Sequence, residues 1–101
     1  MPGRPTDQLR ADAVPRLWRL ARLDYDAVRG RPVLLYPEGA VFLNETGRAI
    51  LELCDGHRTL AQITATLAER FGAEGPDAAG ITTDVADFLG DLVRRELVDV
   101  G

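Results

Sequence analysis

The sequence predicts an α+β fold in which an N-terminal three-stranded antiparallel sheet is followed by three α-helices. Before residue 44, short runs of β-branched, leucine and aromatic residues are separated by turn residues, a pattern typical of strands. After residue 44, apolar residues recur every three or four positions, which is typical of amphipathic helices. The change falls at Leu43-Asn44, because Asn44 is a good helix N-cap directly after a strand-like run.

Three strands are expected between residues 17 and 43. The first covers Leu17–Leu23, the second Val33–Tyr36 and the third Ala40–Leu43. Pro37-Glu38-Gly39 predicts a hairpin between the last two, because proline fixes φ and glycine is free to adopt positive φ. The three strands form a meander, so the third strand lies at an edge of the sheet.

Capping residues mark the first two helices. Asn44 begins the first helix, and Asp55-Gly56 is expected to end it, because glycine readily adopts the left-handed conformation of a C-terminal cap. Thr59 and Gln62 form a capping box at the start of the second helix, in which each side chain accepts from the other residue's backbone amide. Gly72 is expected to end the second helix.

The last helix is expected to open at Ile81–Asp84, after a loop from Ala73 to Gly80. Its apolar residues follow helical spacing; they are Val85, Phe88, Leu89, Leu92 and Val93. Leu97–Val100 predicts either a short terminal strand or a tail packed on the core. The three helices are similar to a winged helix-turn-helix, with the strands displaced to the N-terminus.

Composition is that of one acidic domain. The chain has 101 residues, of which 46% are hydrophobic, and this size is sufficient for a single core. Residues 1–15 contain three of the six prolines, so we expect a flexible arm there and a folded domain at residues 16–101. No apolar run has the roughly 20 residues of a membrane span, and no signal peptide is evident. We therefore expect a cytoplasmic protein with no membrane partner.

The residue types argue against catalysis and metal binding. Cys54 and His57 lie in Cys-Asp-Gly-His, but a structural zinc site needs four ligands and no second pair is present. Cys54 lies on the apolar face of its helix, where a free cysteine behaves as a small hydrophobe. Asp84 and Asp87 are explained as acidic residues that complement a helix dipole. We expect no catalytic residue, no cofactor and no metal.

Nucleic-acid binding is one alternative for a protein with this order of helices. The net charge of −4 argues against it, as do the carboxylates exposed on the last helix, because phosphates repel both. A basic row at Arg16, Arg19 and Arg22 is more commonly a solvated strand face. We therefore expect no nucleic-acid partner.

Recognition of a peptide is the other alternative. The edge strand Ala40–Leu43 would leave backbone amides and carbonyls open, and these can pair with an added strand. Phe88, Leu89 and Leu92 could line a groove beside that edge, although at least one of them must belong to the core.

Several segments taken together resemble the PqqD family. They are Leu34–Gly39, Leu43–Thr46, Ile50–Gly56, Thr59–Ile63 and Asp84-Val85 with Phe88-Leu89 and Leu92. The likeness covers about Leu17 to Val100. It implies a peptide chaperone that binds the ribosomal precursor peptide PqqA and presents it to the radical S-adenosylmethionine enzyme PqqE, in pyrroloquinoline quinone (PQQ) biosynthesis.

The resemblance also implies a binding surface. In this family the module, called a RiPP recognition element, receives the leader peptide as an added strand against its last helix. The implied peptide-binding residues are Ala40, Val41, Phe42, Leu43, Asp84, Val85, Phe88, Leu89 and Leu92. A recognition element of another modified-peptide pathway, or a winged-helix DNA-binding regulator, stays as an alternative. Because exposed edges invite self-association, we expect a monomer or a weak dimer, which could be domain-swapped.

Overall fold

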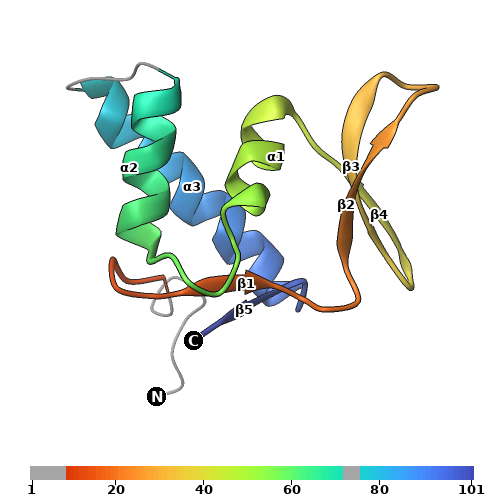
Figure 1. Cartoon of the computed structure of the whole chain (residues 1–101), viewed down its shortest axis with the longest axis horizontal. Coiled ribbons are helices and arrows are strands. Elements are labelled where there is room, and N and C mark those ends of the chain that lie inside the picture. The colour runs from red at the N-terminus through yellow and green to blue at the C-terminus, as the bar shows by residue number, and fades with distance from the viewer. Residues whose placement is uncertain (1–8, 72–75) are drawn as a thin grey trace.

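The computed structural model describes residues 9–71 and 76–101. Its elements are, in order, β1 (Pro15–Leu17), β2 (Arg22–Asp26), β3 (Arg31–Tyr36), β4 (Gly39–Phe42), α1 (Glu45–Glu52), α2 (Leu60–Arg70), α3 (Pro76–Arg94) and β5 (Val98–Val100). The α+β class with three helices is confirmed. Figure 1 shows the strands β2, β3 and β4 at one side, α1 between them and α2, and α3 passing behind α1 and α2.

The strands form two antiparallel sheets. One has the order β2-β3-β4, and the other pairs β1 with β5. The single strand expected over Leu17–Leu23 is therefore wrong: β1 ends at Leu17 and β2 begins at Arg22. Between them Trp18 donates its backbone N–H to the carbonyl of Leu97, and Ala21 donates to that of Trp18. The two halves separate because each pairs with a different partner.

The last helix is longer than expected. It begins at Pro76, not at Ile81, so the predicted loop is wrong from residue 76 onward, and residues 72–75 lie outside the described chain. Proline suits the first turn of a helix because the N–H that it lacks would have no partner there. Gly80 lies inside this helix, a placement that costs only about 1 kcal/mol relative to alanine.

The predicted N-terminal caps of the first two helices are confirmed, whereas Gly72, the predicted end of the second helix, lies outside the described residues. Asn44 Oδ1 accepts from the Gly47 amide at 2.7 Å. Thr59 Oγ1 accepts from the Gln62 amide at 3.2 Å, and Gln62 Oε1 accepts from the Thr59 amide at 2.8 Å. The first helix ends at Glu52, before the predicted stop, and Gly56 follows in a turn with φ +80°.

The core lies between the helices and the inner face of the β2–β3–β4 sheet. Its most deeply buried residues include Leu34, Ile50, Ile63, Leu67, Val85, Leu89, Leu92 and Val98. Leu9 and Ala13, in the segment that the sequence assigns to the arm, are also buried. Residues 1–8 lie outside the described chain, and for them the arm stays a prediction. No helix in the described ranges is long and apolar enough to cross a membrane.

Candidate functional site

Strand β4 forms one edge of its sheet, as predicted, because it pairs only with β3. The register places Val33 opposite Phe42 and Leu35 opposite Ala40. Along β4 the side chain of Val41 is partly buried, whereas those of Ala40 and Phe42 are exposed. Leu43, which follows the strand, is buried in the core.

The ladder between β3 and β4 determines which backbone groups of β4 are open. Leu43 donates its N–H to the Pro32 carbonyl at 2.9 Å. In an antiparallel pair, residues alternate between bonding to the partner strand and pointing away from it. Val41 therefore bonds to β3, while the N–H and C=O of Ala40 and Phe42 point outward. No backbone or side-chain group in the described part of the chain bonds to these outward groups.

A side-chain hydrogen bond from Arg31, on β3, stabilises the end of β4. Pro32 has no N–H, so it cannot donate to the Leu43 carbonyl that faces it. Arg31 Nε donates to that carbonyl instead, at 3.3 Å. The guanidinium carbon of Arg31 also lies 5.7 Å from the centroid of the Phe42 ring, and that of Arg29 lies 5.1 Å from it. The outer face of β4 thus presents an aromatic ring, 41% exposed, with two cations close to it.

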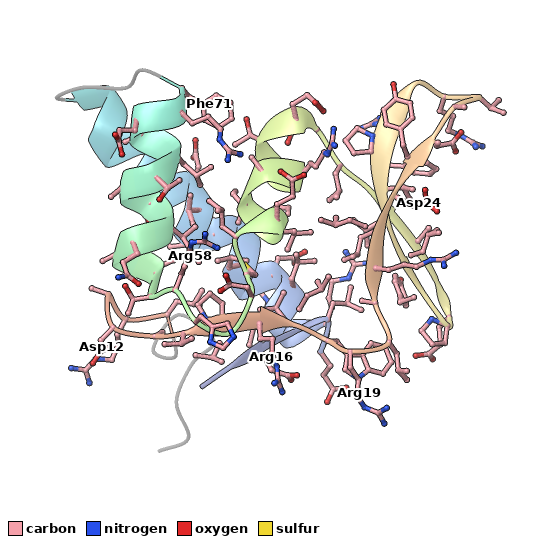
Figure 2. The ribbon with its side chains drawn as sticks, in the orientation of Figure 1. Asp12, Arg16, Arg19, Asp24, Arg58 and Phe71 are labelled. Atoms are coloured by element: carbon pink, nitrogen blue, oxygen red, sulfur yellow. The ribbon has the colours of Figure 1, made fainter. Side chains whose placement is uncertain are left out.

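The opposite edge of the sheet is partly closed. On β2, the amides of Leu23 and Tyr25 point away from β3 by the same alternation. The Tyr25 amide donates to Asp24 Oδ1 at 2.8 Å, so one outward donor of this edge is occupied. Figure 2 shows Asp24 on β2 at the side of the sheet away from the helices. This difference makes β4 the better edge for strand addition.

The α3 residues in the predicted binding set do not share one environment. Val85 and Leu89 are fully buried and Leu92 is 1% exposed, so the structure places all three in the core. Asp84 is exposed and Phe88 is partly buried. Only the last two offer surface to a peptide in this structure, and a charge at Leu89 would test folding instead of binding.

Phe88 connects α3 with the start of α1, the helix that follows the edge strand. Its ring atom Cζ lies 3.2 Å from the position that a Cβ on Gly47 would occupy, and Asn44 Oδ1 lies at the same distance. Because Gly47 is in the first turn of α1, Phe88 packs at the junction of α1 and α3. The sequence predicted correctly that Phe88 lies on the last helix, but only the tertiary structure shows its contact with Gly47.

Sequence reasoning missed the arginines of this surface. Arg29 and Arg31 are in neither the predicted strands nor the predicted binding set, yet both lie against Phe42. The residue that could have pointed to Arg31 is Pro32, since a proline in a strand leaves a carbonyl of the partner strand without a donor. The basic row expected on one strand is divided: Arg16 lies in β1, Arg22 begins β2, and Arg19 lies between them (Figure 2).

The Cys-Asp-Gly-His segment forms a turn after α1. Cys54 is buried and its Sγ donates to the Ile50 carbonyl at 3.3 Å. Burial, with a smaller effect from the charge of Asp55, raises the pKa of the Cys54 thiol to about 12. Asp55 Oδ1 accepts from the amides of His57 at 2.9 Å and Arg58 at 3.1 Å. The amide of His57 is the main reason why the pKa of the Asp55 carboxyl lies below its ordinary value.

Comparison with known proteins identifies relatives of this chain. Residues 32–98 match the family model of coenzyme PQQ synthesis protein D (PqqD). The PqqA binding protein of Kluyvera intermedia is 40% identical over 90 residues, which cover 89% of this chain and 94% of that protein. The PqqA binding protein of Methylococcus capsulatus is 42% identical over 81 residues, which cover 80% of this chain and 82% of that protein.

Two solved structures are similar. One is the solution NMR structure of the PqqD truncation of Methylobacterium extorquens PqqCD, which represents a functional and stand-alone RiPP recognition element. Its TM-score with this chain is 0.72 and its sequence identity is 36%. The match covers 85% of this chain and 88% of the PqqD chain. The crystal structure of PqqD from Xanthomonas campestris has a TM-score of 0.54 and 37% identity, with coverage of 80% and 87%. By sequence and by fold, the chain belongs to the PqqD family.

Proposed function

We propose that this protein is a non-catalytic peptide chaperone of PQQ biosynthesis that binds the precursor peptide PqqA as an added strand on β4. The observation that carries the proposal is the open edge at Ala40 and Phe42, where no described group bonds to the outward N–H and C=O. The names of the relatives, PqqA binding proteins, support the choice of peptide.

The physical mechanism needs no reactive side chain. Two outward donors and two outward acceptors on β4 would pair with the peptide backbone. Phe42 on the edge, and Asp84 and Phe88 on α3 as the resemblance implies, would select the sequence. Ordering a flexible peptide costs roughly 2–5 kcal/mol, so we expect micromolar or sub-micromolar affinity. Such binding permits release, and bringing the peptide to the enzyme PqqE would raise its local concentration there.

The same helices could suggest a winged-helix DNA-binding protein, and that arrangement stays a prediction. The described part of α3 exposes Asp84, Asp87 and Asp91, which would face phosphates if α3 entered a groove. A recognition element for another modified peptide has the same mechanism and differs only in its peptide. We therefore propose peptide binding, with PqqA as the peptide.

Titration of isotope-labelled protein with a synthetic PqqA peptide tests this function. We expect saturable amide shifts at Ala40, Val41 and Phe42, with further shifts around Phe88. A scrambled peptide of the same composition is the control and should leave these amides unmoved.

Two outcomes would contradict the proposal. Saturable binding of duplex DNA, with an affinity that falls steeply as salt rises, would favour the regulator. Shifts confined to Val98 and Val100 would move the site to β5. By the alternation of the ladder between β1 and β5, the N–H and C=O groups of these two residues point away from β1.

A further inference from the structure

A hollow of about 370 Å³ lies between the β3–β4 hairpin and the turn that joins α3 to β5. Its volume is near the lower end of the range of about 300–1,000 Å³ for small-ligand sites. Two aromatic rings, three carboxylates and one guanidinium line it; these belong to Trp18, Tyr36, Glu38, Glu96, Asp99 and Arg95. None of these residues is in the binding set implied by the sequence.

The charges of the hollow favour a cation. Its three carboxylates outnumber its one guanidinium, which belongs to Arg95. This guanidinium already lies 3.7 Å from Oδ2 of Asp91, a residue outside the hollow. Within the described residues, Glu38, Glu96 and Asp99 form no ion pair of their own. A cation placed among them would therefore find unpaired negative charge on several sides.

The two rings add to this preference. A Lys or Arg head group is attracted to the face of an aromatic ring, and tryptophan provides the strongest attraction. Trp18 and Tyr36 are both partly buried, so each keeps part of its surface open to the hollow. An aromatic pair surrounded by carboxylates suits a basic side chain better than an apolar or acidic one.

The hollow adjoins the edge of β4. Glu38 directly precedes Gly39, the first residue of that strand. The Tyr36 hydroxyl lies 3.3 Å from the position that a Cβ on Gly39 would occupy, so the ring lies across the start of β4. A peptide that is paired with β4 and continues past Gly39 reaches the hollow.

We propose that this hollow binds a Lys or Arg side chain of the peptide, next to the segment that pairs with β4. The inference rests on the proposed function, because it places the occupant in the same bound peptide. Backbone pairing on β4 would supply affinity that depends little on sequence, while the hollow would require a basic residue at one position. The net charge of −4 on the chain favours the approach of a basic segment.

Trp18 is the single tryptophan of the chain, so its fluorescence reports on the hollow alone when the peptide carries no tryptophan. The probe is a synthetic PqqA peptide, with any tryptophan replaced by phenylalanine, and a series in which each Lys or Arg in turn is replaced by norleucine. We expect the Trp18 emission to change on binding. One norleucine substitution should remove that change and weaken binding about tenfold, while the β4 amide shifts persist.

Variants of the protein supply the second measurement. Changing both Glu38→Gln and Glu96→Gln should weaken binding of the unsubstituted peptide about three- to tenfold, and should not weaken binding of the critical norleucine peptide further. Glu69→Gln, at an exposed position on α2, is the matched control and should leave both affinities unchanged.

The outcomes separate the two proposals. Amide shifts on β4 with an unchanged Trp18 signal, and equal affinity for every norleucine peptide, would overturn the hollow and leave strand addition standing. Absence of PqqA binding would overturn both, because the hollow is proposed as part of the same site.

Discussion

Cys54 and Asp55 are neighbours in the chain, but their side chains meet opposite environments. The thiol is buried against α1, and its pKa is raised to about 12. The carboxylate is at the surface, where backbone amides and Arg58 favour its charged form and keep its pKa low. Each residue leads to a prediction that depends on its own environment.

Cys54 should be nearly inert to thiol reagents in the folded protein. With a pKa of about 12, only about one thiol in ten thousand is ionised at about pH 8, whereas an ordinary cysteine is substantially ionised there. Reaction with Ellman's reagent should be slow in buffer and fast in urea. Fast labelling of the native protein would show that the thiol is accessible.

Asp55 should make the stability of the protein depend on pH in the acid range. Its pKa in the folded state lies below the ordinary value of 3.8. The resulting stabilisation is present above that ordinary value and is lost as pH falls through the folded-state pKa. Urea unfolding should show that Asp55→Asn is less stable than the parent at about pH 7, and that the difference shrinks as the pH falls below the ordinary value of 3.8. A difference in the free energy of unfolding that does not change with pH would contradict this prediction.

Gly56 should not tolerate a side chain. Its φ of +80° is unfavourable for other residues, and a Cβ there would lie 3.0 Å from Arg16 Cδ. Gly56→Ala should lower the free energy of unfolding by about 1–2 kcal/mol. Gly90→Ala is the comparison: its Cβ would lie 3.4 Å from Leu9 Cδ1, an ordinary contact, and alanine should stabilise α3 by about 0.5–1 kcal/mol. Thermal unfolding of the two variants should therefore shift in opposite directions.

At the scale of elements, the proposed strand addition depends on the backbone of β4. Its outward residues are Ala40 and Phe42, while Val41 and Leu43 bond to β3. A proline at an inward position would break the sheet itself. A proline at an outward position removes only a donor that faces solvent, which an edge strand tolerates.

Ala40→Pro should therefore keep the fold and lose peptide binding. We expect an unfolding temperature close to that of the parent and an affinity for PqqA reduced by about tenfold, because one backbone donor to the peptide is lost. Calorimetric titration measures the affinity. Ala40→Val keeps the amide and serves as the control. Equal binding by Ala40→Pro and the parent would exclude pairing through this edge.

At the scale of the whole molecule, the two ends of the described chain hold the helices together. β1 pairs with β5, and its other side bonds to the turn after α1: Leu17 donates to the Cys54 carbonyl, and Gly56 donates to that of Pro15. The preceding residues reach α2, because Leu60 and Ala61 donate their amides to the carbonyls of Ala13 and Ala11. The N-terminal segment is thus part of the packing.

Deleting residues 1–13 should destabilise the domain. The deletion removes the buried side chains of Leu9 and Ala13, together with two acceptors for the first amides of α2. Burial of a leucine contributes about 1.5–3 kcal/mol, so we expect a loss of at least about 2 kcal/mol in urea unfolding. Leu9→Ala in the full chain should account for most of it. An unchanged midpoint would show that residues 1–13 contribute nothing to the stable domain.

Local chemistry was enough to predict that a meander of strands precedes three helices, the caps at Asn44 and Thr59, and the edge position of the strand before the first helix. Caps, turns and helical spacing act over a few residues, so they can be read directly from the chain. The segments that resemble PqqD are of the same kind, since they are short motifs around these caps and turns.

Contacts between distant residues set the rest. β1 separates from β2 because its partner is β5, at the far end of the chain, and no local pattern identifies that pairing. Val85, Leu89 and Leu92 have the same spacing as Phe88, but neighbouring elements bury the first three and leave Phe88 at the junction beside Gly47. The open groups of Ala40 and Phe42 follow from the register with β3, because a shift by one residue would turn the alternate groups outward.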